Sequence, residues 1–207
     1  MLQRSPEWQA IRAGKICASD AADMLDFLKG GKESAKRRDL RFKLMTERLT
    51  GLPSPSDYVN DAMQRGIDKE PEARSAYEAL TGLLVDTVGF LEHDTLPAGC
   101  SPDGLVMEGI LELKCPKSAT HVRYLRTDAL ITEYRAQLTH ALWISGAPWI
   151  DIASFDDRFP PELSLVVVRL HAKDCDLTAH EAAVRAFLDE LELDIQGVRG
   201  WRAVEVA

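Results

Sequence analysis

The chain has 207 residues, of which 45% are hydrophobic and 28% charged, and its formal net charge is −8 at pH 7. This length suits one globular domain, and the absence of a long apolar run or a signal-peptide core leads us to expect a cytoplasmic protein without membrane association. The acidic balance argues against a protein that coats nucleic acid through its overall charge, although a local positive lining can still bind duplex DNA.

Helices dominate the first part of the chain, about residues 1–82. Ser5 and Pro6 predict the start of a short helix that ends at Gly14, because serine caps helices and proline fits their first turn. The apolar spacing and the stop signals at glycine and proline then predict three more helices. These are expected at residues 19–28, 35–50 and about 58–81.

Strands and helices alternate in the second part, about residues 83–207. Apolar and alternating segments predict strands at residues 83–92, 98–100, 105–107, 110–115, 150–155 and 163–170. The first four strands are expected to form a mostly antiparallel meander. Helices are expected at residues 120–146 and, after a capping box, at residues 178–193. We therefore predict a single α/β domain over residues 1–207, with a central mixed β-sheet flanked by helices.

One predicted hairpin carries the residues of a reaction site. A tight turn places Asp103 before a strand at 110–115 that bears Glu112 and Lys114. Because strand side chains repeat every two residues, Glu112 and Lys114 project from one face, and Asp103 returns beside them. Carboxylates are hard ligands for Mg²⁺ or Mn²⁺, and a lysine can orient or deprotonate a water. The alternative, which is more common on spacing alone, is a surface hairpin with an ordinary Glu/Lys pair.

The turn and strand are two halves of a longer pattern. SPDGL at residues 101–105 and LELKCP at 111–116 accompany W-x-x-x-R-x-G at 8–14, G-x-x-x-E at 66–70 and Y-x-x-Q at 134–137. Together these motifs resemble the lambda exonuclease family of phage and prophage alkaline exonucleases, also called YqaJ-like viral recombinases. The resemblance implies a restriction-endonuclease-like core. It also implies a Mg²⁺-dependent 5′→3′ exonuclease that releases mononucleotides from 5′-phosphorylated duplex ends and leaves 3′ single strands for recombination by annealing.

The resemblance assigns a metal centre. Asp103 and Glu112, with the backbone carbonyl of Leu113, would hold two Mg²⁺ ions, for which Mn²⁺ can substitute, and Lys114 would act on the attacking water. A lysine near metals and apolar side chains is expected to have a lowered pKa, which would suit a base at mildly alkaline pH. The alternative role of Lys114 is that of a charge partner for Glu112, and the two roles are compatible.

Two further residues would support the centre, and three would bind the end of the DNA. Glu70 would complete the metal shell or hold the lysine, and Gln137 would lie near the attacked phosphate. Their alternatives are a helix-surface carboxylate and an amide bonded to a backbone carbonyl. Arg12, Ser19 and Ser101 would bind the 5′-phosphate, because a guanidinium and a helix N-terminus both favour anions. The alternatives are a surface arginine, an N-cap serine and a turn serine.

A basic run precedes and enters the helix at 35–50. Its members are Lys29, Lys32, Lys36, Arg37, Arg38, Arg41, Lys43 and Arg48. Lys29, Arg37 and Arg38 are candidate DNA contacts, although a solvated helix face is the alternative. Met63 matches the position of an apolar wedge that separates terminal base pairs, whereas core packing is the usual role of methionine.

The expected partners are duplex DNA ends, a single-strand annealing protein and two further copies of the chain in a toroidal homotrimer, all by resemblance. Two other functions remain open on the sequence: a structure- or site-specific endonuclease on the same core, and a non-catalytic DNA-end-binding recombination protein. The four cysteines show no C-x-x-C pair and the five histidines no metal-ligand spacing, so buried free thiols and structural histidines are expected.

Overall fold

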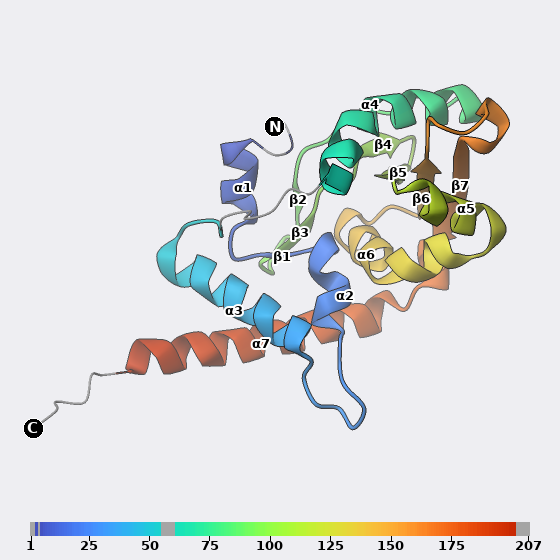
Figure 1. Ribbon diagram of the computed structural model, residues 1–207. Helices are drawn as coiled ribbons and strands as arrows, with labels where there is room; N and C mark the ends of the chain where they lie inside the picture. Colours follow the sequence, from blue (N-terminus) through green and yellow to red (C-terminus); the bar gives the residue numbers. More distant parts are fainter. Residues whose placement is uncertain (1–2, 4, 55–60, 202–207) are drawn as a thin grey trace, which may run out of the picture.

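A mixed sheet of four strands forms the centre of the fold (Figure 1). The structure is a computed structural model, and it describes residues 3, 5–54 and 61–201, without the side chains of 61–63. The order of the sheet is β4-β5-β6-β7. Strand β5 pairs antiparallel with β4 and parallel with β6, and β6 pairs antiparallel with β7. The strands are β4 (Gly104–Val106), β5 (Gly109–Lys114), β6 (Trp149–Phe155) and β7 (Leu165–His171).

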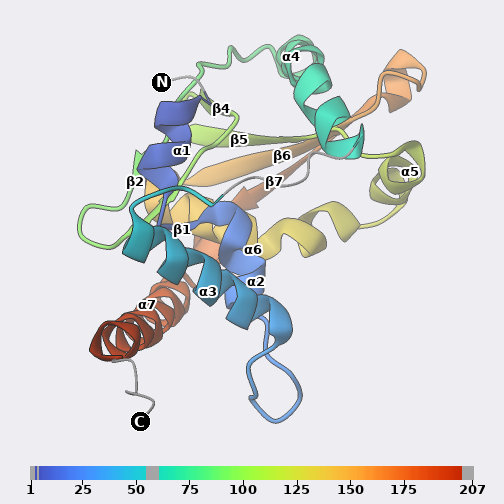
Figure 2. The same cartoon turned by 60° about the vertical axis from the view of Figure 1, so that its left-hand side comes forward.

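Two helices cover the two faces of this sheet, as Figure 2 shows. Helix α6 (Ala129–Ser145) packs on the face that carries Ile110 and Ile152, whereas α4 (Asp61–Thr81) packs its Tyr77 on the face that carries Leu111. Since side chains alternate along β5, Glu112 and Lys114 belong to the α6 face. The sheet therefore presents its acidic and basic side chains beneath α6.

The remaining elements form a second layer around a small three-stranded sheet of order β1-β3-β2. Its strands are β1 (Ile16–Cys17), β2 (Leu91–Glu92) and β3 (Ala98–Cys100), and its helices are α1 (Pro6–Arg12), α2 (Ala21–Met24), α3 (Ala35–Thr50) and α7 (Leu177–Gly200). Helix α5 (Ser118–Arg126) is the exception, because it packs against α6 and β6. Helix α3 packs against α7 (Figure 1), and their contact encloses a core around Leu44 and Phe187. This core joins the N-terminal helices to the C-terminal one.

Several expected elements need correction. The segment 83–92 forms only the short β2 and one isolated bridge, and the expected meander is divided between two sheets, with β5 and β6 parallel. The helix expected at 120–146 is two helices, α5 and α6, and the one expected at 19–28 is a 3₁₀ turn followed by the short α2. Helix α7 continues beyond its expected end at residue 193. Among the described residues, no helix combines the length and apolar character that a membrane span requires.

Candidate active site

The turn before β4 places Asp103 against the end of β5. Strand β4 pairs Gly104 with Leu111, so Asp103, one residue earlier, lies opposite Glu112. The backbone N–H of Asp103 donates to the carbonyl of Leu111 at 2.9 Å. In return the Leu113 N–H donates to Asp103 Oδ2 at 2.7 Å. These two bonds fix the carboxylate beside the strand.

Glu112 is the centre of a compact hydrogen-bonded group. Only 7% of the residue is exposed, and its Oε1 accepts hydrogen bonds from Lys114 Nζ at 2.6 Å and Gln137 Nε2 at 2.7 Å. Lys114 Nζ also lies 3.4 Å from Gln137 Oε1 and 4.5 Å from the centroid of the Tyr134 ring. Sheet and helix α6 thus deliver a carboxylate, an ammonium and an amide to one point.

The charges of this group shift the pKa values of its members. Burial, and next the charge of Glu112, raise the pKa of Asp103 well above its usual value. Burial alone would lower the pKa of Lys114, yet the charge and hydrogen bond of Glu112 outweigh it, and the pKa is raised. Without a bound metal, the pKa shift of Lys114 is thus opposite to the lowered pKa that was expected for a lysine beside metals. The carboxylate beside the lysine favours the ammonium form more than burial disfavours it.

The donor set fits a divalent cation. Two carboxylates, at Asp103 and Glu112, share a buried site in which mutual repulsion raises a pKa, and a cation would relieve that repulsion. Both hydrogen bonds to Glu112 end on Oε1, and that to Asp103 ends on Oδ2, which leaves one oxygen of each for a cation. In the described part of the chain, no group of three or more His, Cys, Asp or Glu forms a metal site. Mg²⁺ usually takes only one or two protein carboxylates, with waters and phosphates.

Glu70 lies on α4, close enough for its charge to raise the pKa of Asp103 further. Its Oε1 accepts a hydrogen bond from Arg74 Nη2 at 3.0 Å. The structure thus places Glu70 near the carboxylate pair. Its proposed part in the metal shell stays a prediction.

The three residues expected at a 5′-phosphate lie around a tryptophan that sequence reasoning missed. Trp8 Nε1 donates to Ser101 Oγ at 2.9 Å, and the Arg12 guanidinium carbon lies 3.9 Å from the centroid of the Trp8 ring. Arg12 Nη2 donates to Ser19 Oγ at 3.4 Å. Trp8 and Arg12 are four residues apart on α1, and this spacing places them on one face of a helix. That spacing was the available signal for Trp8.

The expected DNA contacts have different environments. Lys29 is exposed, and Arg38 is exposed and paired with Asp39 at 2.9 Å. Arg37 is only 3% exposed, donates to the carbonyl of Met24 at 2.9 Å, and its guanidinium forms ion pairs with glutamates of α7 and of the preceding loop. The expectation of a DNA contact is therefore wrong for Arg37, because its charge is used inside the fold.

Met63 falls on α4, but its side chain is outside the described residues, so the expected wedge stays untested. All four cysteines are free, with Cys17 and Cys100 buried and the other two half-buried. The thiol of Cys17 accepts a hydrogen bond from Arg12 Nε at 3.4 Å.

The chain matches the YqaJ-like viral recombinase domain over residues 7–148. Two crystal structures of an alkaline exonuclease from Laribacter hongkongensis, one of them in complex with dAMP, superpose with a TM-score of 0.85 at 36% identity, over 94% of this chain and 96% of theirs. At this identity the two proteins are relatives and not the same protein. The match confirms the expected restriction-endonuclease-like fold.

A phage-related exonuclease from Haemophilus somnus 129PT superposes with a TM-score of 0.66 at 15% identity, over 87% of this chain and 96% of that one. At so low an identity the likeness shows a shared fold alone. No protein of curated function matches the chain.

Proposed function

Because the chain belongs to the YqaJ-like viral recombinase family, we propose that it is a Mg²⁺-dependent exonuclease that degrades duplex DNA in the 5′→3′ direction. Membership of this family supports a nuclease with a role in recombination. The observation that carries the finer proposal is the arrangement of Asp103 beside Glu112, with Lys114 and Gln137 both bonded to Glu112 Oε1. This arrangement unites metal ligands with proton-bearing donors.

The residues divide the work of hydrolysis among them. Asp103, Glu112 and the carbonyl of Leu113 would hold Mg²⁺, or Mn²⁺ in its place, and two ions suit the proposed reaction. Such ions activate water and neutralise the charge of the phosphoryl oxygens. Lys114, protonated at neutral pH, holds the Glu112 carboxylate in place and offers N–H donors to a water or a phosphate oxygen. Gln137 fixes the same carboxylate from α6.

The group around Trp8 supports the choice of a 5′ end. Arg12 forms no ion pair with a carboxylate among the described residues, and its guanidinium stacks on Trp8. A guanidinium without a carboxylate is ready for a phosphate, and it binds phosphate through two parallel hydrogen bonds. With Ser19 and Ser101 beside it, Arg12 would hold a terminal phosphate near the carboxylate pair. Selection of a terminal phosphate would direct cleavage to the 5′ ends of DNA.

We further propose that residues 1–207 form one nuclease domain and that three copies close into a ring around the DNA. In the cytoplasm, the 3′ strand left behind would pass to a single-strand annealing protein. Among the described helices none is suited to cross a membrane.

The test uses linear duplexes with 5′-phosphate or 5′-hydroxyl ends and a closed circle, each with Mg²⁺ or with EDTA. We expect mononucleotides from the linear DNA with Mg²⁺ only, about ten-fold faster from phosphorylated ends, because hydrogen bonds to charged groups contribute roughly 1.5–3 kcal/mol. Arg12→Gln should remove the preference and Arg12→Lys should restore it in part. Efficient cutting of the circle would favour an endonuclease, and tight end binding without hydrolysis would favour a non-catalytic protein.

A further inference from the structure

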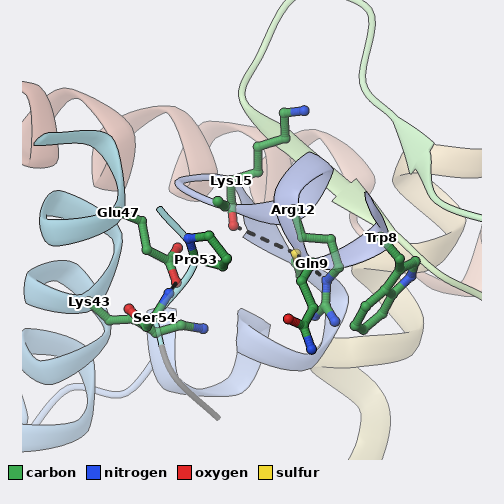
Figure 3. A pocket seen from close by; sticks show the side chains of 10 residues that line it. Trp8, Gln9, Arg12, Lys15, Lys43, Glu47, Pro53 and Ser54 are labelled. Atoms are coloured by element: carbon green, nitrogen blue, oxygen red, sulfur yellow. Dashed lines mark hydrogen bonds between the residues drawn. The ribbon is translucent and has the colours of Figure 1, made fainter. Parts of the chain in front are cut away.

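A cavity of about 490 Å³ lies beside Arg12, between α1 and α3 (Figure 3). Trp8 and Arg12 line it from α1, and Lys43 and Glu47 line it from α3. None of the carboxylates of the proposed metal centre is among its lining residues in the described chain. The volume lies within the range of about 300–1,000 Å³ that is usual for small-molecule sites. The cavity is thus a second compartment that shares Arg12 and Trp8 with the proposed phosphate site.

Two cations face this cavity from opposite walls. In Figure 3, Arg12 projects from the α1 side and Lys43 from the α3 side, while the ammonium of Lys15 points away. Lys15 is occupied, because its Nζ donates to the carbonyl of Ile11 at 2.7 Å and pairs with Glu92. Within the described chain, the one ion pair of Lys43 is a long one with Asp20, at 3.7 Å, and its side chain is 45% exposed. Its charge is therefore available to a ligand.

Among the described lining residues, the one carboxylate is already satisfied. Glu47 Oε2 accepts a hydrogen bond from the Gly14 N–H at 2.8 Å, and Glu47 Oε1 accepts one from the Ser54 N–H at 3.0 Å. Both oxygens are thus turned to the backbone, where two N–H dipoles offset their charge. The cavity presents two cations to a ligand against one neutralised anion, which favours an anionic group.

We propose that this cavity binds a second phosphate group, attached on the 5′ side of the phosphate that Arg12 holds. The inference rests on the proposed role of Arg12 and extends it to a new class of DNA end. Lys43 would contact the added phosphate, and Trp8 and Arg12 would be shared by both groups. The added phosphate has two chemical sources: a 5′-polyphosphate end, or one further 5′ nucleotide, which would then leave as part of a dinucleotide.

Binding of small nucleotides without metal or DNA tests this directly. By calorimetry in EDTA, dADP should bind about three- to five-fold more tightly than dAMP, a modest gain because Lys43 is nearly half exposed. Lys43→Gln should remove that gain and leave dAMP binding unchanged, whereas Lys43→Arg should retain it. Lys36→Gln is the matched control, since it makes the same charge change at an exposed position two turns earlier on α3, outside the cavity.

The phosphorylated dinucleotide pdApdA distinguishes the two sources. A gain for dADP alone supports polyphosphate ends, and a gain for pdApdA supports an added nucleotide. Equal affinities of all three ligands, no measurable binding, or an equal loss in Lys43→Gln and Lys36→Gln would overturn the proposal. Because no hydrolysis is measured, a failure here leaves the exonuclease proposal standing. Conversely, an exonuclease assay that fails would leave a measured dADP gain intact.

Discussion

Glu112 connects strand β5 to helix α6 through a single oxygen atom and also faces the turn before β4. Its Oε1 accepts from Lys114 on the same strand and from Gln137 on α6, while Asp103 faces it from the turn before β4. A residue with this many partners is poorly suited to substitution. Asp103 is different, because its charged form is opposed by burial and by the neighbouring carboxylate. A substitution that removes the charge of Asp103 should therefore lower activity and raise stability.

Asp103→Asn should abolish hydrolysis and at the same time raise stability in the absence of metal. Its folded pKa is raised, so its charged form weakens the fold at pH values above its unfolded pKa, and the uncharged amide removes that cost. We expect a loss of at least about 100-fold in kcat, because a metal ligand is removed, and an increased Tm in EDTA. Activity assays and thermal unfolding check this. Substantial turnover with Mg²⁺ would refute the metal assignment.

Lys114→Ala should lose at least about 100-fold in kcat while DNA binding persists, since the residue acts on the reaction and not on the duplex. Without metal, burial opposes the ammonium form of Lys114, but the charge of Glu112 outweighs it and raises the pKa, which favours a role as a donor over that of a base. Lys114→Arg should therefore recover part of the rate, because it keeps the charge. A fully inactive arginine variant with intact folding would instead indicate a base.

At the scale of elements, α3 carries the buried charge of Arg37 and the exposed charge of Arg38, of which only the second stays a predicted DNA contact. Arg37→Gln should cost about 2–3 kcal/mol of unfolding free energy, because it breaks a buried network with Glu33 and Glu190. Arg38→Gln should leave stability nearly unchanged and flatten the salt dependence of DNA binding by about one unit in the logarithmic slope. Chemical denaturation and binding at several salt concentrations check both. An unchanged slope in Arg38→Gln would mean that the exposed face of α3 is solvated and does not contact DNA.

The turn at Gly14, directly after α1, contacts side chains of α3. Gly14 has φ +72°, and an added Cβ would lie 2.7 Å from Arg48 Cγ, whose side chain donates through Nε to the Gly14 carbonyl at 2.8 Å. Gly14→Ala should cost about 1–3 kcal/mol and also weaken the preference for 5′-phosphorylated ends, because Arg12 precedes this turn. Gly31→Ala is the control, since Gly31 has φ +79° and open space around it. If both variants lower the end preference equally, the turn does not position Arg12.

Local signals predicted the long helices better than the strands. The helix at 35–50 was expected from its apolar stripe and the stop signals at Gly51 and Pro53, and α3 spans Ala35–Thr50. The segment 83–92 has strand composition, yet only Leu91–Glu92 forms a strand and Asp86 a single bridge to Leu105, because pairing depends on distant partners. The parallel pairing of β5 with β6 depends on the crossover through α5 and α6, and no pattern within either strand encodes it.

The same division holds for the site. The alternation at 110–115 was sufficient to place Glu112 and Lys114 on one face, because that geometry is local. The alternation was not sufficient to predict the direction of the Lys114 pKa shift, since this direction follows from burial and from the hydrogen-bond distance to Glu112 together. Arg37 shows the same limit, because its partner Glu190 lies on α7, far along the chain.

For the whole molecule, α7 is joined to α6 by two buried histidines. His180 Nε2 and His140 Nδ1 lie 3.1 Å apart, and the residues are 6% and 0% exposed. Burial lowers the pKa of His140 to about 3 and that of His180 to about 4, and the charge of His180 adds to the shift of His140. Both histidines are therefore neutral in the folded protein at pH values where the unfolded chain already binds protons.

This pair predicts a loss of stability in mild acid. With folded pKa values below the unfolded value of about 6.5, stability is complete above that pH and falls as the pH drops toward 4, by up to about 1.4 kcal/mol per unit for each histidine. Asp156 and Asp157, whose pKa values are lowered to about 2, lose their contribution only below about pH 4. Asp103, whose raised pKa acts in the opposite direction, remains in every protein compared below, so a difference in slope between pH 6.5 and 5 reports on the histidines.

His180→Asn should make the dependence of unfolding free energy on pH shallower in this window by about one histidine, because it removes one of the two depressed groups. His171→Asn, at a partly exposed histidine of β7, controls for the removal of any histidine. Chemical denaturation at pH steps between 7.5 and 5 provides the slopes, and the carboxylates that all three proteins share cancel in the comparison. If His180→Asn and the wild type show the same slope while His171→Asn differs, the pair that joins α6 to α7 is not the acid-sensitive part of this fold.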